Sequence, residues 1–131
     1  MIEKYYLNGD ELPNILTPHD CQVKEIYLKD EYLVFELGDD LFEYDSIEYV
    51  YPNALSLVIR YHLIDDVSVV IENKNGYKNL ELNKMLKKHK FMEYLYHYVR
   101  YDSMIIELFN GKSIIFKLYC DYVEYEWKLE E

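Results

Sequence analysis

The sequence MIIELFNGKSIIFKLY, residues 104–119, carries the clearest structural signal in the chain. Runs rich in apolar residues flank Asn110-Gly111, and these two residues tolerate the positive φ angles that a type I′ turn requires. The stretch therefore predicts a β-hairpin near the C-terminus, with strands over 104–109 and 112–119. Val123 to Leu129 then alternates between apolar and charged residues, which predicts a further half-buried strand.

Short strands separated by polar turns are predicted for most of the N-terminal half. Apolar residues there follow a period of two, as in Leu33, Phe35 and Leu37, which share one face. We expect strands over 21–29, 32–37, 41–44, 47–51, 55–61 and 67–71. Short turns between strands of this length are typical of an antiparallel meander.

The periodicity changes after residue 79, where apolar residues recur at steps of three and four. Leu82, Met85 and Leu86 begin a stripe that continues to Val99, and this predicts one amphipathic helix over roughly 80–100. Asn79 is the expected N-cap. Alternating aromatic residues beyond Tyr94 also suit a strand, so a helix that ends near residue 90 is the alternative.

These patterns together predict an α+β fold in one domain, residues 1–131. The fold is predominantly an antiparallel β meander of about eight strands, with the helix placed before the C-terminal hairpin. We expect the sheet to curl over the helix rather than to form a closed sandwich.

Composition narrows the class of protein. The chain has 131 residues, a formal net charge of −11 and 16 tyrosines, and so many aromatic residues are incompatible with disorder. It has no apolar run of membrane-spanning length and no secretion-signal layout, so we expect a cytoplasmic protein with Cys21 and Cys120 as free thiols. Scarce alanine with abundant Ile, Asn, Lys and Tyr is typical of an AT-rich bacterial or phage genome.

The charge is unevenly distributed along the chain. Residues 1–72 carry net −12, residues 73–100 carry +5, and residues 101–131 carry −4. We interpret the basic segment as a helix that lies on an acidic sheet and lowers its self-repulsion. The overall acidity argues against direct binding to nucleic acid or to an anionic membrane.

Few residues suggest catalytic chemistry. His89, Glu93 and His97 are spaced by four and could ligate zinc or iron, although they do not form an HExxH motif. The alternative is that His89 borders the apolar stripe and the other two are solvated. Because the chain has no nucleophile motif and no glycine-rich phosphate loop, we expect a protein that is not an enzyme and needs no cofactor.

Two carboxylate pairs and the surplus of tyrosines suggest binding instead. Asp39-Asp40 and Asp65-Asp66 lie at expected turns, where they could simply solubilise the ends of hairpins, and Tyr49 and Tyr51 are candidates for exposed contact residues. We expect a small inhibitor-like module, of the immunity, antitoxin or phage anti-defence type, for a basic or nucleic-acid-binding protein. The alternatives are a curved sheet or barrel that binds a small ligand, a metal-dependent enzyme, and a homodimer formed by edge strands.

Overall fold

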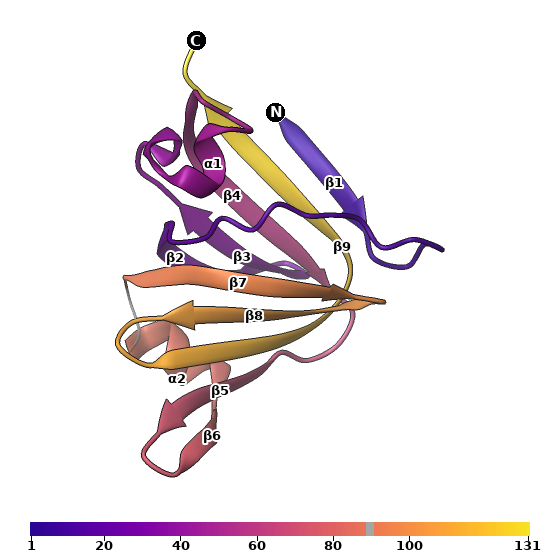
Figure 1. Cartoon of the computed structure of the whole chain (residues 1–131). Helices are drawn as coiled ribbons and strands as arrows, with labels where there is room; N and C mark the ends of the chain where they lie inside the picture. The colour runs from indigo at the N-terminus through magenta and orange to yellow at the C-terminus, as the bar shows by residue number, and fades with distance from the viewer. Residues whose placement is uncertain (89–90) are drawn as a thin grey trace.

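A computed structural model describes residues 1–88 and 91–131, and its architecture is predominantly antiparallel β-sheet (Figure 1). The strands are β1 (Ile2–Tyr6), β2 (Gln22–Lys29), β3 (Tyr32–Leu37), β4 (Ala54–Leu63), β5 (Ser68–Asn73), β6 (Gly76–Leu80), β7 (Met92–Arg100), β8 (Ser103–Phe109) and β9 (Ser113–Leu129). The helical elements are the 3-10 turn η1 (Leu41–Glu43) and the short helices α1 (Asp45–Glu48) and α2 (Leu82–Lys88). The predicted β-rich α+β class is confirmed.

The strands close into a ring around the core. Neighbouring strands pair in the order β4-β3-β2-β7-β8-β9, and β9 pairs in turn with β4. Strand β1 adds to β9, and the β5–β6 pair extends the sheet from the other half of β9. Phe35 of β3 and Phe116 of β9 meet inside the ring, with ring centroids 5.6 Å apart. The apolar side chains that the period-two pattern places on one face of each strand therefore pack against one another inside the ring.

Strand β9 can pair with two halves of the sheet because it changes face in its middle. Ile114, Phe116 and Cys120 point inward in the first half, whereas Val123 and Tyr125 point inward in the second half. The register with β4 shifts at the same place. A one-residue irregularity of this kind bends a strand and re-aims its side chains, and here it closes the ring.

The described join between β2 and β7 is short. Among the described residues, two pairs connect these strands, Gln22 with Glu93 and Val23 with Met92. Phe91, immediately upstream of Met92, is not paired with β2. The edge of β2 from Lys24 to Lys29 therefore has no partner strand among the described residues, and a groove lies beside it.

The predicted long helix is wrong beyond its first two turns. Helix α2 ends at Lys88, and residues 92–100 form strand β7, which pairs with β8 along its length. Hydrogen bonding to β8 stabilises the segment with alternating aromatic residues as a strand. The spacing of its apolar residues at steps of three and four also fits a helix. Asn79 lies in β6 and is not an N-cap.

The core lies inside the strand ring and not between the sheet and a helix, so the predicted curling of the sheet over the helix is also wrong. Met85 is the one residue of α2 that is fully buried.

Three further local predictions differ from the structure. Residues 41–43 and 45–48 form η1 and α1 instead of two strands, because Leu41 and Ile47 bury their side chains from short helical turns. Strand β1 was not predicted. The turn between β8 and β9 has three residues, since Phe109 pairs with Ser113, and Gly111 takes a φ of 94°.

Candidate functional site

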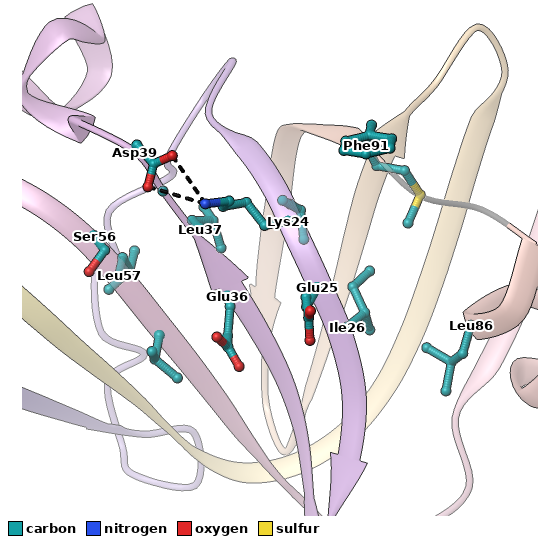
Figure 2. A pocket seen from close by; sticks show the side chains of 14 residues that line it. Lys24, Glu25, Ile26, Glu36, Leu37, Asp39, Ser56, Leu57, Leu86 and Phe91 are labelled. Carbon is teal, nitrogen blue, oxygen red and sulfur yellow. Dashed lines mark hydrogen bonds and ion pairs between the residues drawn. The ribbon is translucent and has the colours of Figure 1, made fainter.

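A groove of about 650 Å³ lies beside the free edge of β2 (Figure 2). Strands β2, β3 and β4 form one wall, and Leu86 of α2 with Phe91 and Met92 forms the other. The full lining comprises Val23, Lys24, Glu25, Ile26, Glu36, Leu37, Gly38, Asp39, Ser56, Leu57, Val58, Leu86, Phe91 and Met92. Its volume lies within the range of pockets that bind ligands, roughly 300–1,000 Å³.

Two carboxylates face each other at the centre of this wall. Glu25 of β2 and Glu36 of β3 are direct cross-strand partners. Directly opposed like charges destabilise a sheet, and no described basic side chain lies within ion-pair distance of either carboxylate. The Tyr27 hydroxyl donates a hydrogen bond to Glu36, which raises the pKa of Tyr27. Among the described residues, the two carboxylates thus have no basic partner, and a cation could neutralise their charge.

An exposed ion pair borders the groove at the end of β3. Lys24 Nζ lies 3.1 Å from both carboxylate oxygens of Asp39, whose side chain is 81% exposed. Exposed pairs of this kind contribute about 0–1 kcal/mol. A partner's charged group could therefore exchange with either member at small cost.

The opposite wall of the groove is apolar. Phe91 is 73% exposed although it is a large aromatic residue, and Leu86 of the same wall is half-buried, as is Ile26 on the β2 wall. Phe91 also has a φ of 58°, a value that is rare for a bulky residue. Strained residues that expose an apolar ring beside a cavity are typical of binding sites.

The structure divides the predicted binding residues between two ends of the molecule. Asp39 and Asp40 follow β3 near the groove, whereas Asp65 and Asp66 follow the far end of β4. Since Leu37 pairs with the beginning of β4, the two carboxylate pairs are separated by roughly 20 Å of strand. The two pairs cannot both contact one small ligand.

The two predicted tyrosines differ in their exposure. Tyr49, at the end of α1, is 87% exposed and so is available to a partner. Tyr51 packs its ring on Trp127 at 4.5 Å and donates a hydrogen bond to Glu3 at 2.6 Å. Tyr51 therefore has a structural role in joining α1 to β1 and β9.

The predicted metal ligands are only partly described, because His89 lies outside the described residues. Glu93 is exposed, and a bulge between Tyr94 and Tyr96 changes the side-chain alternation before His97. His97 Nε2 donates to the Ile15 carbonyl at 3.0 Å, and Nδ1 accepts from the Tyr94 hydroxyl at 2.5 Å. Burial lowers the pKa of His97.

Within the ranges 1–88 and 91–131, no three His, Cys, Asp or Glu side chains cluster as metal ligands. Both cysteines are free and buried, and burial raises the pKa of Cys21 to about 11 and that of Cys120 to about 12. A thiol with so high a pKa is a poor nucleophile.

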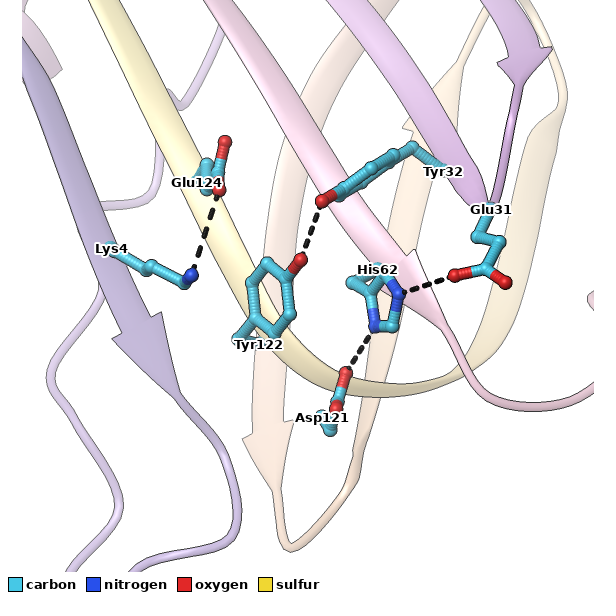
Figure 3. A network of polar contacts seen from close by, with 7 residues as sticks. All are labelled: Lys4, Glu31, Tyr32, His62, Asp121, Tyr122 and Glu124. Carbon is cyan, nitrogen blue, oxygen red and sulfur yellow. Dashed lines mark hydrogen bonds and ion pairs between the residues drawn. The ribbon is translucent and has the colours of Figure 1, made fainter.

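A second polar cluster lies at the bend of β9 (Figure 3). His62 Nδ1 lies 2.6 Å from Asp121, and its Nε2 lies 3.0 Å from Glu31. The His62 ring stacks on Tyr122 with centroids 4.6 Å apart, and the Tyr122 hydroxyl lies 2.5 Å from that of Tyr32. Both ring nitrogens of His62 are engaged, so the cluster joins β3, β4 and β9.

Several tyrosines are exposed on the strands, as the composition predicts. Three others, Tyr61, Tyr94 and Tyr125, are fully buried in the core. The exposed tyrosines are Tyr6, Tyr49, Tyr77, Tyr96, Tyr98, Tyr101 and Tyr119.

Sequence reasoning did not single out Glu25, Glu36 or Phe91. A signal for the first two was present, because the two-residue turn Asp30-Glu31 fixes the register of β2 and β3 and so places Glu25 opposite Glu36. No sequence signal indicates that Phe91 is exposed.

Two further observations bear on function. No helix among the described residues combines the length and hydrophobicity needed to cross a membrane. No protein-family model, curated protein or solved structure matches this chain. Among the described residues, the groove is therefore the feature that best indicates a function.

Proposed function

We propose that this chain is a non-catalytic, inhibitor-like protein-binding module that binds a basic surface of a partner protein. The observation that carries the proposal is the facing pair of Glu25 and Glu36, which has no described basic side chain within ion-pair distance and lies in a groove with an exposed apolar wall. Opposite charge steers a basic partner toward the site and speeds association. An aromatic anchor such as Phe91 slows dissociation.

The net charge supports the same function. At −11, the chain attracts basic proteins over a distance of about 10 Å at moderate salt. Asp39, Asp40 and Tyr49 lie toward the groove end of the molecule and extend the contact area. Asp65 and Asp66, at the far end of β4, act at most through long-range attraction.

Site-specific photo-crosslinking in the cells from which the chain comes tests this function. A photoreactive phenylalanine analogue at position 91 should capture one basic protein, and the same group at Tyr101, which is also exposed, should not. The capture should decline when Glu25 and Glu36 are both changed to Gln, and in cells permeabilised at high salt. Equal capture at positions 91 and 101 would contradict the proposal.

The groove volume favours a second function, the binding of a small cationic ligand. A cavity of about 650 Å³ is large enough for a drug-sized molecule. A ligand of this kind would place its cation at Glu25 and Glu36 and its apolar part against Phe91. Native mass spectrometry of protein purified from its own cells would show the added mass.

A further inference from the structure

We infer that the partner binds as an extended segment that adds a strand to the free edge of β2, with basic and apolar side chains in alternation. This inference rests on the proposed function and specifies its ligand. The occupant is a stretch of a partner protein about six residues long, because the free edge runs from Lys24 to Lys29.

The free edge supplies the backbone part of the recognition. Strand β2 pairs with β3 on one side, but beyond Val23 no described strand pairs with its other side. An unpaired edge presents backbone N–H and C=O groups to a partner strand. The groove lies directly beside this edge, since residues 23–26 of β2 line it. An added strand would thus continue along β2 from the point where its described pairing with β7 ends at Val23.

Side chains of alternate residues then meet two different surfaces. Glu25 and Glu36 lie on the outer face of the sheet and suit the basic residues of the segment. Ile26 and Leu28 pair in register with the core residues Phe35 and Leu33, and so lie on the opposite face. Leu28 is nevertheless 45% exposed, because no described strand pairs with β2 on that side. An apolar residue of the incoming segment would cover it.

Charge distinguishes a partner protein from a second copy of this chain. Two copies would each bring a net charge of −11 and their own Glu25 and Glu36 carboxylates to the contact, and these like charges repel. Charged residues on an edge strand are a known protection against self-pairing. A basic segment, in contrast, neutralises the carboxylate pair and still forms the backbone hydrogen bonds.

The test uses the full chain and a fluorescein-labelled hexapeptide in which arginine and isoleucine alternate. Two further peptides carry N-methyl groups, one on its arginine amides and the other on its isoleucine amides. Only one set of amides can face β2 in an added strand. We therefore expect one methylated peptide to bind at least about tenfold more weakly than the other, by fluorescence anisotropy. Amide exchange of residues 24–29 should slow on binding of the unmethylated peptide.

Equal affinities for the two methylated peptides, or no binding of any peptide, would overturn strand addition. If equal affinities are accompanied by a loss of binding in the Glu25→Gln/Glu36→Gln variant, the groove binds charge only, and the proposed function stands. If that variant binds the peptide as tightly as the unchanged chain does, the proposed function itself fails. Asp10→Asn/Glu11→Gln, which removes two exposed carboxylates away from the groove, is the matched control.

Discussion

His62 Nδ1 lies 2.6 Å from a carboxylate oxygen of Asp121, across the bend that closes the strand ring. The hydrogen bond to Asp121 raises the pKa of His62, and Glu31 raises it further, although partial burial opposes both. Protonated His62 is therefore more stable in the folded chain than in the unfolded chain. This contribution is complete below the unfolded pKa of about 6.5 and is lost as pH rises through the folded pKa.

We accordingly predict that His62→Gln lowers the free energy of unfolding most at pH 5–6, by up to about 1 kcal/mol. The difference from the unchanged chain should shrink at higher pH. Urea unfolding at several pH values measures it. Asp121→Asn should reduce the same pH dependence, with Glu31 retaining part of it, and the double variant should add little to His62→Gln. A pH slope that survives His62→Gln would contradict this assignment.

The opposed carboxylates of Glu25 and Glu36 predict a conflict between stability and binding. Glu25→Gln removes the cross-strand repulsion and should stabilise the chain by about 0.2–1 kcal/mol at low salt. The gain should diminish at high salt because ions screen exposed charges. Thermal unfolding at two salt concentrations measures it. Glu11→Gln makes the same change of charge without a facing carboxylate, and an equal gain in that variant would attribute the effect to net charge alone.

The anchoring of α2 gives a third prediction. Met85 is the helix residue that is fully buried, so Met85→Asp places an unpaired charge in the core and should cost several kcal/mol. Asn83→Asp adds the same charge at an exposed position of the same helix and should change stability by less than about 0.5 kcal/mol. Chemical denaturation compares the two variants. Similar stabilities would show that α2 is not anchored through Met85.

Much of the sheet could be predicted because the residues that determine its strand pairing lie close together in the sequence. Alternation in residues 32–37 and the turn at Asp30-Glu31 together specify the pairing of β2 with β3, including the opposed carboxylates. The apolar residues around Gly111 specify the pairing of β8 with β9 in the same way. The turn between β8 and β9 is one residue longer than predicted, because backbone geometry determines the turn length and the sequence pattern does not.

The remaining features depend on contacts between distant residues. Strand β7 forms because β8 and Gln22–Val23 offer it hydrogen-bond partners, whereas its own sequence also fits a helix. In the sequence alone, the change of face near Asp121 resembles a break between two strands. In the structure, β4 pairs with β9 on both sides of it, so β9 continues as one strand. The groove is related to the first of these features, since it lies beside β2 where the described pairing with β7 ends. Local periodicity carries no information about that separation.

The hydrogen bond that links Tyr94 to His97 gives the last prediction. Tyr61 and Tyr94 are both fully buried, and burial raises the pKa of each well above its ordinary value. The Tyr94 hydroxyl lies 2.5 Å from His97 Nδ1, whereas the Tyr61 hydroxyl has no hydrogen-bond partner among the described residues.

Tyr94→Phe leaves the His97 nitrogen without its donor and should cost about 1–3 kcal/mol. Tyr61→Phe removes a hydroxyl that forms no such bond and should be neutral or stabilising. Urea unfolding of the two variants measures this difference. Both variants lose one hydroxyl oxygen from the same core, so the comparison isolates the hydrogen bond. His97 also donates a hydrogen bond to the Ile15 carbonyl. Tyr94→Phe should therefore speed amide exchange in residues 15–21, and Tyr61→Phe should not. Equal losses of stability in both variants would mean that the Tyr94–His97 bond contributes nothing specific.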